Sequence, residues 1–200
     1  MKKICLVLTA ASLAACTFGH SSEPARFYTL STPNIEQIRG PKSRVNVAID
    51  NVSVPQSVDR PQIVIKHPNS NMLSVSEFDR WIEGLPNALP IVISENMNIY
   101  AKNINARPGR RQMSESNNNY HLAIDFVRFD TEIDGVITIS AWWTVTNNRG
   151  DVVAQKKTTK TAVTPDGDIN APDYDAIVRT QSRLIAELSY KIADVISELK

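Results

Sequence analysis

The chain has almost no cysteine: Cys5 and Cys16 are the two in its 200 residues. Both lie within the first sixteen positions, so the rest of the chain has no thiol for a disulfide, a metal site or a cysteine nucleophile. A fold without cross-links depends on its apolar core, and the 42% of hydrophobic residues are enough to build one in a chain of this length.

Glycine and histidine are also scarce, with seven and three residues. The glycines form none of the G-x-S-x-G, G-x-G-x-x-G or phosphate-loop patterns that mark common enzyme and nucleotide sites. His20, His67 and His121 lack the spacing of a metal-ligand pair. Carboxylates within residues 125–134 alternate along an expected strand and its turn, which is typical of a solvated face. We therefore expect no catalytic residue, no metal ligand and no bound cofactor, and predict that the protein is not an enzyme.

Neither sign of charge is in excess, since 22 basic residues stand against 21 acidic ones. Nucleic-acid binding usually requires a clear basic balance, so nucleic acid is not an expected partner. Long hydrophobic runs are absent as well. The apolar run near the start of the chain is far shorter than the roughly 20 residues that a membrane-spanning helix needs.

That N-terminal run has the composition of a secretory signal peptide. Two lysines begin it, residues 4–11 are apolar apart from one threonine, and Leu-Ala-Ala at 13–15 leads into Cys16. This ending resembles a lipobox, the signal at which bacterial lipoproteins are cut before a cysteine that carries lipid. We expect residues 1–15 to be removed and Cys16 to bear a covalent lipid such as palmitate. The alternative is an ordinary signal peptide that happens to contain this cysteine.

The residue after Cys16 bears on which membrane holds the anchor. Thr17 stands there, whereas an aspartate at this place commonly retains Gram-negative lipoproteins at the inner membrane. The expected location is therefore the outer membrane, with the protein facing the periplasm. We predict a lipidated cysteine and short tether over residues 16–25 and a single periplasmic α/β domain over residues 26–200.

Hydrophobic periodicity divides that domain into strands and helices. Apolar and polar residues alternate, or apolar residues run between turn signals, at 27–30, 45–50, 62–66, 72–76, 120–132, 136–147 and 152–163. Spacings of three and four predict helices at 85–103 and 172–200, and residues 107–119 read as a polar loop.

Short turns containing glycine join the last three strands, which predicts an antiparallel meander. The predicted fold class is α/β of the α+β type. It has a mainly antiparallel mixed sheet with a C-terminal meander, packed by two principal helices, one of them C-terminal.

Two adjacent tryptophans in strand 136–147 should point to opposite faces of the sheet. Trp143 shares its face with aliphatic residues and is expected in the core. Trp142 shares the other face with threonines and serines, which makes it a candidate interface residue unless a loop or helix covers it. Basic residues form two further clusters, for which a solvated surface is the simpler interpretation than a partner or membrane contact: Arg107, Arg110 and Arg111, and Lys156, Lys157 and Lys160.

A further motif reads Val-Asp-Arg-Pro-Gln-Ile-Val over residues 58–64. With Phe-Tyr-Thr-Leu at 27–30 before it and Arg80-Trp81 after it, the chain resembles the PqiC/YmbA-like family of ABC-type transport auxiliary lipoproteins. The resemblance extends through most of the chain after the lipobox. Val58 departs from it, because leucine is frequent there in the family.

The resemblance makes five residues candidates for partner contact: Asp59, Arg60, Gln62, Arg80 and Trp81. A structural role is an equally good interpretation of the motif. Arg60 precedes a proline, which favours an extended backbone, and Asp59 would pair with Arg60 or a neighbour to direct the chain into the next strand.

The function that the resemblance implies is non-catalytic docking. The family pattern describes an outer-membrane-anchored accessory lipoprotein that works with an MCE-domain protein spanning the periplasm, in lipid transport between the two membranes. A homo-oligomeric ring would match the symmetry of such assemblies. Two other functions stay open: an envelope-scaffolding or binding lipoprotein that contacts peptidoglycan or a secretion pore, and a periplasmic hydrolase whose site has no sequence motif.

Overall fold

The computed structural model describes residues 23–33, 45–109, 119–165 and 172–199. Several sequence-based predictions lie outside these residues, namely the signal peptide, the lipidated Cys16, most of the tether, His20, Arg110, Arg111 and Lys200. In the part that is described, no helix is long and apolar enough to cross a membrane.

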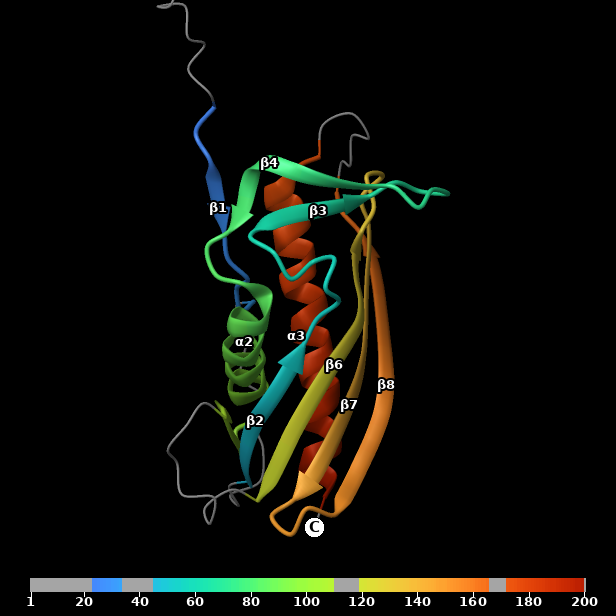
Figure 1. The fold of residues 1–200 in the computed structure, drawn as a ribbon. Helices are drawn as coiled ribbons and strands as arrows, with labels where there is room; N and C mark the ends of the chain where they lie inside the picture. The colour runs from blue at the N-terminus through green and yellow to red at the C-terminus, as the bar shows by residue number, and fades with distance from the viewer. Residues whose placement is uncertain (1–22, 34–44, 110–118, 166–171, 200) are drawn as a thin grey trace, which may run out of the picture.

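The larger of the two sheets has five strands in the order β5-β2-β6-β7-β8 (Figure 1). These strands are β2 (Val45–Ser53), β5 (Ile104–Pro108), β6 (Tyr120–Thr131), β7 (Val136–Asn147) and β8 (Val152–Val163). The last three form the predicted antiparallel meander, whereas β2 runs parallel to both β5 and β6. Gly135 and Gly150 occupy the two meander turns with φ of 86° and 85°, a backbone region that glycine enters without steric cost.

The smaller sheet has three strands in the order β1-β4-β3. They are β1 (Arg26–Tyr28), β3 (Gln62–Lys66) and β4 (Leu73–Trp81). β3 and β4 form an antiparallel hairpin, and β1 lies parallel to β4 along its other edge. A single bridge between Lys66 and Glu132 connects this sheet to the end of β6.

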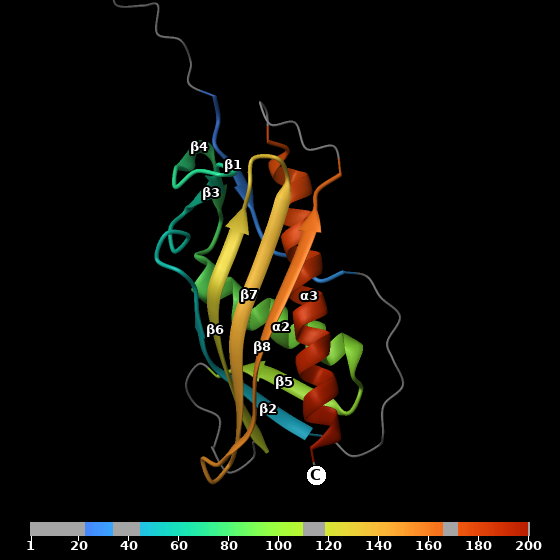
Figure 2. The ribbon, with the colours of Figure 1, turned by 90° about the vertical axis from the view of Figure 1, so that its right-hand side faces the viewer.

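Two helices pack on one face of the large sheet (Figures 1 and 2). Helix α3 (Tyr174–Glu198) contacts β7 and β8, and α2 (Leu85–Tyr100) contacts β2 and β5. Asp173 caps α3, since its carboxylate accepts a hydrogen bond from the backbone N–H of Ala176 at 3.0 Å. Among the described residues, no helix covers the opposite face of the large sheet, which we call the outer face.

The core lies between the helices and the large sheet. The C-terminal helix contributes the predicted apolar stripe, of which Ile177, Leu184, Leu188 and Ile192 are at most 3% exposed. The largest side chains that are fully buried are Trp143, Phe126, Ile49, Ile63, Ile65, Leu85, Leu89, Ile93, Met97, Leu122, Ile124 and Ile137. The α/β fold class with two principal helices is therefore confirmed.

Two predictions about residues 85–119 are corrected by the structure. The first helix ends at Tyr100 and not at residue 103, because Ala101 already has an extended backbone with φ −124° and ψ 106°. Residues 104–108 form β5, so the expected polar loop is wrong at Arg107 and Pro108, while most of the rest of it lies outside the described residues. Asn98 holds β5 in place. Its side chain accepts a hydrogen bond from the N–H of Ala106 at 2.7 Å and donates one to the carbonyl of the same residue at 2.9 Å.

Strand β7 has the predicted alternation, with one difference on its outer face. Thr138 and Ser140 belong to the polar face that Trp142 shares, yet they are 7% and 2% exposed. Their hydroxyl groups pair with those of Thr161 and Thr159 on β8, at 3.2 and 2.7 Å. Burial is tolerated because these polar atoms have hydrogen-bond partners.

Candidate functional site

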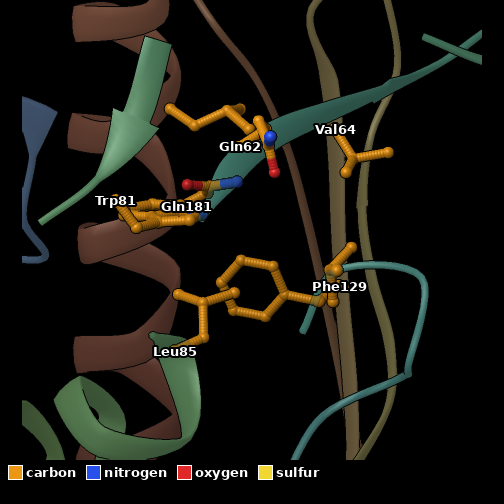
Figure 3. Close-up of a pocket in the computed structure, with 8 residues that line it drawn as sticks. Gln62, Val64, Trp81, Leu85, Phe129 and Gln181 are labelled. Atoms are coloured by element: carbon orange, nitrogen blue, oxygen red, sulfur yellow. The ribbon is translucent and has the colours of Figure 1, made fainter. Parts of the chain in front are cut away.

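The Val58–Val64 motif lies where the two sheets meet the start of α2 (Figure 3). The backbone N–H of Trp81 donates to the carbonyl of Pro61 at 2.6 Å, and Gln62 pairs with Arg80 across the hairpin. The fold thus brings together two motifs that are separated in the sequence. The motif forms a joint between β3, β4 and α2.

The individual motif residues differ in exposure. Asp59 and Arg60 are exposed on the turn that follows Pro55, and among the described residues neither makes the ion pair expected for Asp59. Trp81 is 5% exposed, so it belongs to the core and not to a contact surface. Gln62 and Arg80 are half-buried. The observed contacts support the structural interpretation of the motif.

A small cavity lies within this joint, and Gln181 of α3 points toward it (Figure 3). The Gln181 amide donates to Thr131 Oγ1 at 2.9 Å, while its carbonyl oxygen is buried and has no hydrogen-bond partner among the described residues. The cavity measures about 10 Å³, which is the space of one water molecule. Small-molecule sites typically measure about 300–1,000 Å³, so this cavity is too small to be one.

A wider groove of about 260 Å³ lies between the end of β8 and the first half of α3. Arg179 and Arg183 line it together with Val163. Both arginines are already paired on their own helix, Arg179 with Asp175 and Arg183 with Glu187. The groove therefore offers little unpaired positive charge to an anionic ligand.

Trp142 stands on the outer face in a row of residues that crosses four strands. Asp125 lies opposite it on β6 and Lys157 opposite it on β8, and Ser53 on β2 hydrogen-bonds to Asp125. The Lys157 ammonium lies 5.7 Å from the centre of the indole ring, within the range of a cation–π contact. Trp142 is 46% exposed, so the row of Ser53, Asp125, Trp142 and Lys157, here called the Trp142 row, presents a large aromatic surface to the surroundings.

The neighbouring Trp143 has the opposite environment. It is 1% exposed on the helix-covered side, and its indole N–H donates to Thr158 Oγ1 at 3.0 Å. The predicted strand register is therefore confirmed.

The lysines of β8 do not form one basic surface. Lys157 lies opposite Trp142 on the outer face, whereas Lys156 and Lys160 pair with inward-facing positions of β7. Lys160 also forms an ion pair with Glu187 of α3 at 3.1 Å. Alternation along the strand therefore divides the cluster between two sides of the sheet.

A buried carboxylate that the sequence did not single out holds β1 against β4. Asp79 is 2% exposed and accepts hydrogen bonds from Arg26 Nε at 2.7 Å and Nη2 at 2.9 Å, from the Tyr28 hydroxyl at 2.9 Å and from Ser76 Oγ at 2.8 Å. We call these four residues the Asp79 clamp. The sequence did contain a signal for this buried carboxylate. Asp79 and Trp81 occupy alternate inward positions of one strand, and a charged side chain at an inward position needs hydrogen-bond or ion-pair partners.

The clamp changes the acidity of its members. Burial by itself would raise the pKa of Asp79, but the hydrogen bonds from Arg26, Ser76 and Tyr28 outweigh it and hold that pKa below its ordinary value. Burial, followed by the hydrogen bond to Asp79, raises the pKa of Tyr28. The Asp79 carboxylate is therefore kept ionised, and in this form it accepts the hydrogen bonds that hold β1 against β4.

The histidines show no catalytic arrangement in the described part of the chain. His67 pairs with Ser74 at 2.7 Å in an exposed hairpin, and His121 pairs with Asp50 at 2.7 Å on the outer face. Within the same residues no group of three or more His, Cys, Asp or Glu side chains is placed to hold a metal ion.

Two solved structures share this fold. A protein from Xanthomonas campestris superposes with a TM-score of 0.68 at 17% sequence identity, covering 86% of this chain and 96% of its own. A second, described as an uncharacterized protein, gives a TM-score of 0.69 at 16% identity, covering 87% of this chain and 99% of its own. At such identities the likeness shows the fold alone. No curated protein matches the sequence.

Comparison with protein families identifies a family and not only a fold. Residues 28–193 match the family described as the ABC-type transport auxiliary lipoprotein component. The matched span begins at the last residue of β1 and contains the Val58–Val64 motif, the meander and most of α3. It covers well over half of the chain and agrees with the family that the motif residues predicted. The chain thus belongs to the ABC-type transport auxiliary lipoprotein family, whose members serve as auxiliary components of transport systems.

Proposed function

We propose that this chain is an outer-membrane-anchored, periplasm-facing lipoprotein that docks an MCE-type intermembrane lipid transport assembly and does no catalysis itself. Residues 1–15 are removed, Cys16 carries the lipid, residues 16–25 are the tether and residues 26–200 are the docking domain. Family membership supports an auxiliary role in transport. The lipobox and Thr17 support the anchor and its location.

Trp142 is the observation that carries the docking role. Tryptophan is enriched among the residues that dominate binding energy at protein interfaces. Burying this ring would remove apolar surface from water. The ring stands on a strand that is paired on both sides and contacts Lys157, so its motion is already restricted and binding has less freedom to remove. The Trp142 row therefore supports a protein contact on the outer face, with the MCE-domain partner or with a second copy in a ring.

The test compares Trp142→Ala with a matched exposed control, Val152→Ala, in the lipidated protein. Val152 is 60% exposed at the start of β8 and lies outside the row. Loss of an anchoring tryptophan is expected to weaken binding of the purified MCE-domain partner, or self-association, by about 2 kcal/mol, which is roughly 30-fold. Binding would be measured by sedimentation velocity in detergent, and Val152→Ala should behave as the parent protein. Equal binding by all three proteins would show that the outer face does not dock a partner.

A further inference from the structure

The tip of the β3–β4 hairpin, formed by the turn and the first residues of β4, exposes a cluster of apolar side chains. Met72, Leu73 and Val75 are 55%, 47% and 43% exposed. They lie within residues 67–76, a stretch with no Asp, Glu, Lys or Arg. Isolated exposed apolar residues are ordinary, but three so close together on a projecting turn mark a contact surface.

The hairpin holds this cluster outward on a fixed backbone. Ile63 and Ile65 of β3 are 1% and 2% exposed and anchor the hairpin to the core. The N–H of His67 donates to the carbonyl of Met72 at 3.1 Å, and Asn69 turns the chain with φ of 54°. The apolar side chains of the turn are therefore displayed by a closed hairpin and not by an extended loop.

The hairpin and the start of the described chain lie at the same end of the molecule (Figures 1 and 2). β1 runs parallel to β4 and is fixed to it by the Asp79 clamp, so residues 23–25 approach from that end. Glu23 follows Cys16 by seven residues, and seven residues of fully extended chain span at most about 25 Å. A lipid on Cys16 therefore holds this end of the molecule within reach of the membrane.

We propose that the tip of the β3–β4 hairpin, with Met72 in the turn and Leu73 and Val75 at the start of β4, inserts into the interfacial region of the membrane that holds the Cys16 lipid. This inference rests on the proposed lipid anchor. A lipid surface suits the hairpin tip because shallow insertion buries apolar side chains, and residues 68–76 carry no ionisable side chain to desolvate. Lys66 pairs with Leu73 at the base of the tip and would stay at the level of the headgroups.

The consequence is a second point of attachment that fixes the orientation of the domain. A single tether leaves a protein free to tumble, whereas a tether and an inserted turn together restrict its rotation relative to the membrane. The β7–β8 turn and the end of α3 lie at the opposite end of the molecule and would point into the periplasm (Figure 1). The outer face with its Trp142 row would then lie at the side of the molecule, between the membrane end and the periplasmic end, where a partner can reach it.

The test uses the lipidated protein, which begins at Cys16, with one introduced thiol. Cys16 is blocked by lipid and no other cysteine follows it, so Asn71→Cys places a single reactive thiol beside the apolar cluster without removing it. Arg149→Cys, on the β7–β8 turn at the opposite end, is the matched control, since its side chain is 80% exposed. Each thiol would carry an environment-sensitive fluorophore in vesicles of phosphatidylethanolamine and phosphatidylglycerol containing a doxyl-labelled quencher lipid.

The expected result is a blue shift and loss of emission for the label at position 71 and neither change at position 149. Adding Met72→Ser and Leu73→Ser to Asn71→Cys should abolish the shift and the quenching while the protein still floats with the vesicles. Vesicle-bound protein in which both labels stay unquenched would overturn the inserted turn and leave the anchor intact. Protein that carries no lipid and does not float would overturn the anchor, and the present inference with it.

Discussion

Trp143→Ala should be among the most destabilising single substitutions in the domain. The side chain is 1% exposed in the middle of β7, between neighbours that belong to the helix-covered core. Truncation of a buried tryptophan to alanine typically costs about 3–5 kcal/mol through lost apolar contacts and the cavity that remains. The same change removes the indole donor of Thr158 Oγ1, which adds about 1 kcal/mol when the hydroxyl finds no other partner.

Two further variants separate these contributions. Trp143→Phe keeps most of the apolar ring and loses the 3.0 Å hydrogen bond, so it should cost about 1–2 kcal/mol. Trp142→Ala changes the adjacent residue on the opposite face, and since it is 46% exposed its loss should cost less than either change at position 143.

The assay is reversible urea denaturation followed by far-UV circular dichroism, with the midpoint and slope fitted separately. A loss below about 1 kcal/mol for Trp143→Ala, or a larger loss for Trp142→Ala, would refute the assignment of Trp143 to the core.

Three more changes test other parts of the account. Cys16→Ala should abolish incorporation of labelled palmitate and release the protein from membranes or leave its signal uncut; continued lipid labelling would contradict the lipobox. Leu188→Ala, at 1% exposure in the α3 stripe, should lower the free energy of unfolding by about 2–5 kcal/mol in the same denaturation assay. Asp79→Asn should be less stable than the parent at neutral pH, with a difference that shrinks on acidification. The reason is that the folded protein lowers the pKa of Asp79, so the stability gained from its ionised form is complete above the unfolded pKa of about 3.9 and is lost as pH falls through the lower folded value. An unchanged difference in acid would show that the clamp does not depend on the charge.

Local periodicity was enough to predict the parts of the fold that carry strong repeating patterns. The C-terminal helix has a stripe that includes Leu184, Leu188 and Ile192, and the meander has long alternating strands with glycine turns. The opposite directions of Trp142 and Trp143 follow from the same period of two.

Contacts between distant segments were not predictable in the same way. β5 is five residues long, carries polar side chains and ends at Pro108, so nothing local marks it as a strand. Its parallel pairing with β2 joins segments separated by more than fifty residues. The Asp79 clamp likewise depends on Arg26, 53 positions earlier, and only the fold brings the two together.

The candidate site was likewise predictable only in part from the sequence. The motif residues were identified from a resemblance, yet their role at a joint between two sheets and α2 became visible only when Pro61 and Trp81 were seen to share a hydrogen bond. Trp81 is buried there, so the surface candidates are reduced to the exposed members of the motif and to Trp142.

The most direct test of the central claim is isolation of the tagged, lipidated protein from outer-membrane fractions, followed by mass spectrometry of the proteins that accompany it. We expect an MCE-domain protein to be enriched with the parent protein and with Val152→Ala, and to be depleted with Trp142→Ala. Recovery of lipidated protein from the outer membrane with no MCE-domain protein in any of the three preparations would contradict the claim.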